Sequence, residues 1–87
     1  MLNVTIEHYK DETISIQKIS DDNVVLAKIT EDNTINLDVC IPYINKEISI
    51  EHTYTNDNTK NCKLSATLEA VETDPLTKVK CIRYSML

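Results

Sequence analysis

The stretch KISDDNVVLAKITEDNTINL, residues 18–37, places the quartets SDDN (20–23) and TEDN (30–33) in the same phase, in a chain that contains no glycine. Tight hairpin turns need backbone with φ above zero, which asparagine and aspartate adopt more readily than other non-glycine residues. Asp and Ser side chains at the start of a turn also accept hydrogen bonds from backbone N–H groups. We therefore predict two successive hairpin turns in which asparagine replaces glycine. The repeat is then one strand plus one turn.

Apolar and polar residues alternate on both sides of this stretch, as they do in strands with one buried face. Proline cannot donate to a ladder, so Pro42 ends a strand or lies at an edge. The strands predicted from this alternation, with their inward residues, are 2–9 (Leu2, Val4, Ile6), 13–19 (Ile14, Ile16), 34–43 (Ile35, Leu37, Val39, Ile41) and 47–54 (Ile48, Ile50, with His52 and Tyr54 in the same phase).

Three further segments have patterns that need a separate interpretation, and one of them, 62–72, also alternates. The unbroken apolar run 24–27 is typical of a strand covered on both faces, by a second layer or by another subunit. Residues 62–72 fit a strand, and their Leu and Ala content also fits a helix. We favour the strand, because TDP (73–75) and the segment after it complete a long hairpin. That last strand changes phase after Cys81, which predicts a bulge.

These elements predict an all-β protein with at most one short helix. The expected architecture is a small antiparallel meander of about six or seven strands that forms a β-sandwich or a barrel. Residues 1–87 are expected to form a single domain. A chain of this length buries a thin core, which leaves little room for a deep pocket.

Charge and hydropathy limit the partners. The net charge is −5 and the pI about 4.8, which argues against direct nucleic-acid binding. No apolar run approaches the roughly 20 residues of a membrane span, and the N-terminal stretch lacks the features of a secretory signal. We therefore expect a soluble cytoplasmic protein, in the host cytoplasm if it is phage-encoded. The odd number of cysteines, three, favours reduced and buried thiols.

The residues that carry chemistry form no motif. Cys40, Cys62, Cys81, His8 and His52 include no closely spaced pair of the kind that zinc sites use, so we expect no metal and no cofactor. The two histidines are the only conventional bases. Loops that cradle phosphate or stabilise an oxyanion usually depend on glycine, which is absent. We therefore expect that the protein is not an enzyme.

Acidic turns and tyrosines are the candidates for a binding surface. Tyrosine is enriched at interface hot spots, and acidic residues complement a basic surface. The composition is similar in kind to that of phage or mobile-element accessory proteins. The leading hypothesis is a non-enzymatic inhibitor or adaptor that binds a host protein with a basic surface. The expected contact residues are Asp21, Asp22, Glu31 and Asp32 in the turns, and Tyr9, Tyr43, Tyr54 and Tyr84 near strand ends.

Two alternatives belong to other classes. An oligomer that sequesters a nucleotide-like signal would stack the base on tyrosines and hold phosphates with Lys78, Lys80 and Arg83. A structural subunit of a virion or larger assembly is the third hypothesis. A homo-oligomer is also expected, because some apolar residues fall outside the main core phase. These are Val24, Leu26, Ile82, Tyr84 and Met86.

Overall fold

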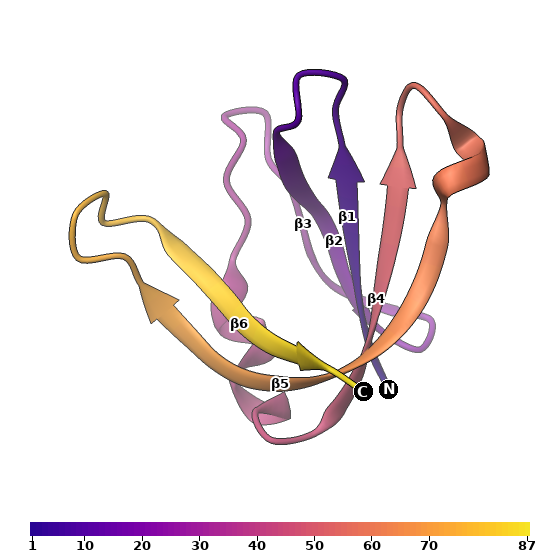
Figure 1. Cartoon of the computed structure of the whole chain (residues 1–87). Coiled ribbons are helices and arrows are strands. Elements are labelled where there is room, and N and C mark those ends of the chain that lie inside the picture. The colour runs from indigo at the N-terminus through magenta and orange to yellow at the C-terminus, as the bar shows by residue number, and fades with distance from the viewer.

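Six strands form one open sheet in the computed structural model, which describes all of residues 1–87 (Figure 1). The strand order is β3-β2-β1-β4-β5-β6. The mainly β prediction is confirmed, and because the sheet has two edges, neither a barrel nor a sandwich is confirmed. The elements are β1 (Leu2–His8), β2 (Ile14–Asp21), β3 (Val24–Lys28), the 3-10 helix η1 (Leu37–Tyr43), β4 (Glu47–Tyr54), the 3-10 helix η2 (Asn58–Lys60), β5 (Cys62–Thr73) and β6 (Lys80–Met86).

The prediction of a purely antiparallel meander is wrong at the centre of the sheet. β1–β2–β3 and β4–β5–β6 are each antiparallel meanders, but β1 and β4 pair in parallel, with Asn3 opposite Ser49 and His8 opposite Tyr54. A parallel pair needs a crossover connection between its strands. Here the chain returns through η1, so that β4 begins at the same end of the sheet as β1 (Figure 1).

The expected strand at 34–43 is a 3-10 helix over most of its length. The side chain of Asn36 accepts a hydrogen bond from the backbone N–H of Asp38 at 3.1 Å and caps the helix. A 3-10 helix has three residues per turn, so Leu37 and Cys40 point the same way, and both are buried. Ile41, expected inward, is exposed. The spacing of three suits a buried helix face as well as alternation suits a strand, and packing of Leu37 and Cys40 on the core selects the helix.

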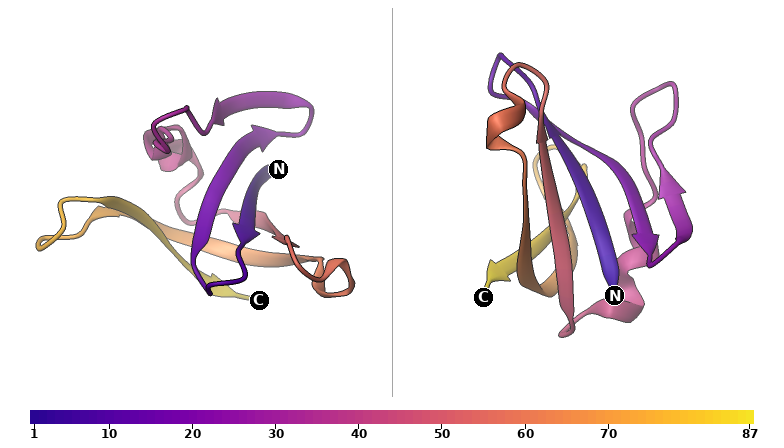
Figure 2. Two further views of the ribbon diagram at one scale, coloured as in Figure 1. Left: turned by 90° about the horizontal axis from the view of Figure 1, so that it is seen from above. Right: turned by 90° about the vertical axis from the view of Figure 1, so that its right-hand side faces the viewer.

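Ten apolar side chains form the core on one face of the sheet. Alternate residues of β1 and β4 supply its centre, and η1 adds two residues from above that face. η1 contacts β3, β5 and β6, and Figure 2 shows the sheet bent around the space that η1 partly fills. The core residues are Leu2, Val4, Ile6, Ile19, Leu37, Cys40, Ile48, Ile50, Ala66 and Leu68.

The two predicted turns exist, with different geometry from that expected. The hairpin at 20–23 joins β2 to β3, but the residue with positive φ is Asp22 (51°) and not Asn23. At 30–33 Asn33 has φ of 63°, as predicted, and its N–H donates to the Thr30 carbonyl at 3.0 Å. This second turn leads into η1 and so does not join two strands.

β3 is an edge strand, so the prediction that a second layer of this chain covers both of its faces is wrong. Val24 is 63 % exposed, and Val25 and Leu26 are also exposed. The expected second apolar face does not form, because β3 and β6 lie at opposite edges of the sheet and Ile82 and Tyr84 pack against the core. Val24, Val25 and Leu26 are exposed because the strand order places β3 at one edge of the sheet.

The C-terminal hairpin follows the prediction. Residues 62–73 form strand β5, and β6 pairs with it in antiparallel register. The expected irregularity is present but falls in β5, between Leu68 and Ala70, and not in the last strand. The extra residue in β5 lets Val71 return to the core side of the sheet, opposite Ile82.

Truncation of a central core residue should cost much of the stability. Ile50 in β4 is fully buried, so Ile50→Ala is expected to lower the free energy of unfolding by about 2–5 kcal/mol, because it leaves a cavity in the core between β1 and β5. Urea denaturation followed by circular dichroism measures this change. Leu76, in the β5–β6 turn, is 91 % exposed, and Leu76→Ala serves as the control, with a change within about 0.5 kcal/mol. Equal effects of the two substitutions would contradict this core.

The three thiols should differ in reactivity. Cys40 is buried in η1, and burial raises its pKa to about 11, whereas Cys62 and Cys81 are exposed, contrary to the sequence prediction. Since the thiolate is the reactive form, we expect two thiols to react with Ellman's reagent near pH 8 in the folded protein and the third only on unfolding. Rapid reaction of Cys40 in the folded protein would contradict the position of η1.

Candidate functional site

An apolar cleft of about 670 Å³ lies beside η1 on the core side of the sheet. Ten of its 14 lining residues are hydrophobic. Ile14 and Ile16 of β2 form one wall, and Ile82 and Tyr84 of β6 form the other. Leu37 of η1 lines the cleft next to the core. Its volume falls in the range of about 300–1,000 Å³ that is typical of ligand sites.

The cleft exists because the short helix η1 fills only part of the space enclosed by the bent sheet. Residues 33–35, just before η1, and residues of β6 both line the cleft. Figure 2 shows β6 facing the segment before η1 across the space that the bent sheet encloses. Lys80 Nζ at the start of β6 and Asp38 Oδ1 in η1 form an ion pair of 2.6 Å. This pair joins the two sides of the cleft at one end. The mouth keeps large apolar side chains in contact with water: Ile14 is 61 % exposed and Val79 is 62 % exposed.

The turn at 30–33 places its acids beside this cleft. Asn33 and Thr34 line the cleft, and Glu31 and Asp32 precede them in the chain. Hydrogen bonds from the hydroxyls of Thr30 and Thr34 lower the pKa of Asp32, which keeps its carboxylate ionised. Neither Glu31 nor Asp32 forms an ion pair within the chain. The cleft therefore has free negative charge at one rim.

The two acidic turns do not form one surface, contrary to the prediction. They lie at opposite ends of β3 (Figure 1). Both Asp21 and Asp22 form ion pairs of 3.1 Å with the N-terminal ammonium of Met1. The Tyr43 hydroxyl donates to Asp21 at 2.6 Å and, together with that ammonium, lowers the pKa of Asp21. A repeat of one strand plus one turn necessarily puts successive turns at opposite ends of the strand.

The four tyrosines are likewise dispersed. Only Tyr84 lines the cleft, and Tyr43 serves as the partner of Asp21. The Tyr9 hydroxyl donates to Glu7 at 3.2 Å on a separate part of the surface. The Tyr54 ring stacks on His8, with 4.2 Å between ring centroids. The structure therefore does not bring the tyrosines together into one rim.

The basic residues predicted to hold phosphate are mostly paired with acids. Lys80 pairs with Asp38, and Arg83 pairs with Glu72 at 2.7 Å and with Glu69 at 3.4 Å. Lys78 lies in the β5–β6 turn, where it has φ of 62°. Of the three predicted basic residues, only Lys78 forms no ion pair. One lysine is too little positive charge to hold the phosphates of a nucleoside diphosphate or triphosphate.

Sequence reasoning missed a histidine pair at the other end of the core face. His8 Nε2 and His52 Nδ1 are 2.7 Å apart, so one ring nitrogen donates and the other accepts. Burial, and then the nearby His8, lower the pKa of His52. The parallel register of β1 and β4 creates this contact, and no spacing along the chain signals it. No group of three His, Cys, Asp or Glu side chains is arranged as a metal site.

The histidine pair should give the protein a pH dependence. Because the pKa of His52 is lowered on folding, the unfolded chain binds more protons, and stability should fall as pH drops below the ordinary histidine pKa of about 6.5. We expect His8→Gln to raise the pKa of His52 toward that value, as measured by NMR titration of the imidazole protons. An unchanged pKa for His52 would contradict the close approach of the two rings.

Comparisons with protein-family models, with curated proteins and with solved structures find no match to this chain. No helix of the structure has the length and apolar character that crossing a membrane requires. Function is therefore inferred from the geometry of the cleft and of the polar face opposite to it.

Proposed function

We propose that this protein is a non-enzymatic binding module that takes up an apolar segment of another protein in the cleft between β2 and β6. The observation that carries the proposal is the mainly hydrophobic lining of the cleft, with Ile14 and Val79 still exposed at its mouth. Large apolar side chains that remain exposed around a concave surface favour burial by a partner. An inhibitor or adaptor that acts on a host protein would use such a site.

The acidic residues beside the cleft indicate that the partner segment carries a basic residue. Glu31 and Asp32 are free of ion pairs beside the cleft, so a basic residue next to the apolar segment would be attracted to them. Asp21 and Asp22 lie at the far end of β3 and are occupied by the N-terminus, so we exclude them from the proposed interface. Among the tyrosines, Tyr84 is the one that would contact the partner.

The edge of β6 supports binding of an extended segment. β6 is the last strand of the sheet, so one side of its backbone has no neighbouring strand. The four consecutive residues 79–82 all line the cleft. Side chains of successive strand residues point to opposite faces of the sheet, so side chains on one face alone would not account for four consecutive lining residues. We infer that the free backbone edge of this segment borders the cleft. Strand addition uses such an edge for backbone hydrogen bonds and an adjacent apolar surface for side chains.

A second candidate is a small uncharged apolar molecule, which the volume of the cleft favours. A nucleotide-like signal fits less well, because Lys80 and Arg83 are paired with acids. Self-association is proposed through β3, whose edge carries the exposed Val24 and Val25. A role as a structural subunit would build on the same edge.

Selection of short peptides from a random displayed library tests the main proposal. Selected peptides should be rich in apolar residues with a flanking Lys or Arg. Val79→Lys, in the cleft, is expected to weaken peptide binding at least about tenfold, which corresponds to ~1.4 kcal/mol, because it puts a charge where the apolar segment is buried. Fluorescence anisotropy with a labelled selected peptide measures the affinity.

Val24→Lys is the matched control, since Val24 is as exposed as Val79 but lies on β3, away from the cleft. The control should bind the peptide as the unmodified protein does. Peptides that bind the Val79→Lys variant with full affinity would overturn the assignment of the cleft. Affinity that is insensitive to salt and to the double change Glu31→Gln and Asp32→Asn would overturn the basic flank.

A further inference from the structure

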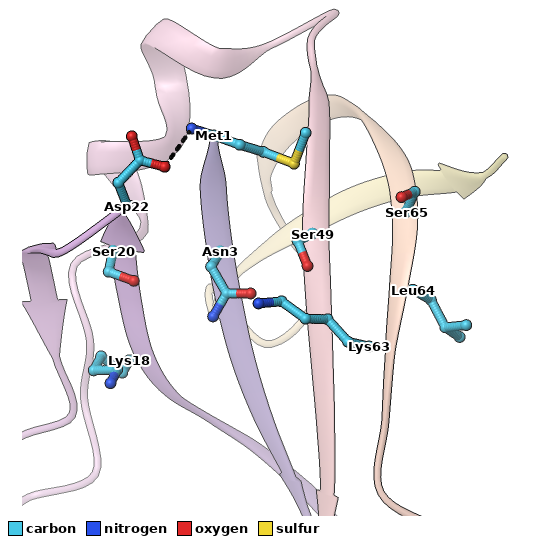
Figure 3. A pocket seen from close by; sticks show the side chains of 9 residues that line it. All are labelled: Met1, Asn3, Lys18, Ser20, Asp22, Ser49, Lys63, Leu64 and Ser65. Atoms are coloured by element: carbon cyan, nitrogen blue, oxygen red, sulfur yellow. Dashed lines mark hydrogen bonds and ion pairs between the residues drawn. The ribbon is translucent and has the colours of Figure 1, made fainter.

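The face of the sheet opposite the cleft contains a polar hollow of about 520 Å³ (Figure 3). Its base is a row of small polar residues that crosses four neighbouring strands. Ser20 of β2 is opposite Asn3 of β1, Asn3 is opposite Ser49 of β4, and Ser49 is opposite Ser65 of β5. With strands about 4.8 Å apart, the row is about 14 Å long. A bare ion would occupy only part of it.

One side-chain atom of this row, Asn3 Oδ1, is buried without a hydrogen-bond partner, and the two serines beside it are buried, whereas Ser65 is exposed. Ser20 is 6 % exposed and Ser49 is 9 % exposed, although both lie on the polar face. Asn3 donates through Nδ2 to Glu51 at 3.2 Å and to Thr5 at 3.4 Å, and its buried Oδ1 has no hydrogen-bond partner. A buried acceptor without a partner is costly, so the site calls for a ligand that supplies a donor.

Two lysines stand beside this row. In the next row of the sheet Lys18 is opposite Thr5, and Lys63 is opposite Glu51. Neither lysine forms an ion pair, although the chain as a whole is acidic. Figure 3 shows the Lys63 side chain extending across β4 toward Asn3.

Among the residues that line the hollow, three positive groups outnumber one acid: Lys18, Lys63 and the N-terminal ammonium against Asp22. Lys28 lies directly opposite Lys18 in the β2–β3 register, so like charges meet on this face. Glu51, which is opposite Lys63 in the register, accepts a hydrogen bond from the Asn3 amide and forms no ion pair with Lys63. At the other end of the hollow the N-terminal ammonium pairs with Asp22 and also with Asp21, so it offsets only part of their negative charge. An anion would therefore be stabilised beside Lys18 and Lys63.

We propose that this hollow is a binding site for a small phosphorylated polyol of the sugar phosphate class. Lys18 and Lys63 hold the phosphate as charged donors. The hydroxyls of the sugar donate to Asn3 Oδ1 and exchange hydrogen bonds with Ser20 and Ser49. The site is separate from the apolar cleft, since Asn3 alternates along β1 with the core residues Leu2 and Val4.

Isothermal titration calorimetry of the full chain tests the site with glucose 6-phosphate, ribose 5-phosphate, glucose and inorganic phosphate as separate probes. At least one sugar phosphate should bind saturably, and at least about tenfold more tightly than phosphate or glucose alone, because each half of the ligand meets its own groups. The double change Lys18→Gln and Lys63→Gln should lower that affinity at least about tenfold and reduce its dependence on salt.

Two further variants keep the result specific. Ser49→Ala should weaken the sugar phosphate while leaving the affinity for phosphate unchanged, because it removes a hydroxyl that meets only the sugar. Lys60→Gln, in η2 and outside the hollow, is the matched charge control and should have no effect. Amide shifts in NMR should concentrate at Asn3, Ser20 and Ser49.

Three results would overturn the proposal. One is the absence of saturable binding by both sugar phosphates at millimolar concentration. Another is the combination of two results: inorganic phosphate binds as tightly as the sugar phosphates, and Ser49→Ala has no effect. That combination would mean that the two lysines bind any phosphate and that the polar row takes no part. The third is a set of shifted amides that maps to the apolar cleft.

Discussion

The parallel pairing of β1 with β4 is the constraint on which the rest of the structure depends. It places side by side, at the centre of the sheet, the two strands that supply half of the ten core residues, so that Leu2 and Val4 meet Ile48 and Ile50. A parallel pair cannot be joined by a tight turn, so the chain must cross one face of the sheet before β4 begins. The crossover carries η1, and η1 closes the core with Leu37 and Cys40.

The size of that crossover explains why the protein has an open cleft. Seven residues of 3-10 helix cover only part of a bent six-stranded sheet. A longer α-helix would also bury the part of the core face between β2 and β6. Here that part remains open as an apolar cleft. The opposite face has no covering element, so its buried serines and Asn3 lie in a hollow formed by side chains of the sheet itself.

Local ion pairs decide which charges remain available for partners. The N-terminus is shared by Asp21 and Asp22, Lys80 joins β6 to η1, and Arg83 is held by two glutamates of β5. Exposed pairs of this kind each add only about 0–1 kcal/mol to stability. Their main consequence is that they decide which charged residues remain without an ion pair. Glu31 and Asp32 remain unpaired near the cleft, and Lys18 and Lys63 remain unpaired beside the row of small polar residues. The two proposed sites use opposite charges on opposite faces.

Alternation of apolar residues by itself determined β1, β2 and β4, because a strand with one buried face is a local pattern that needs no knowledge of its neighbours. The same pattern failed at 34–43, where the spacing of Leu37 and Cys40 also suits a helix and only packing on the core selects it. Tertiary structure alone decided that β3 is an edge, that the acidic turns lie apart, and that Asn3 meets Ser20 and Ser49. These features depend on strand order and register, which follow from contacts between residues distant in the chain.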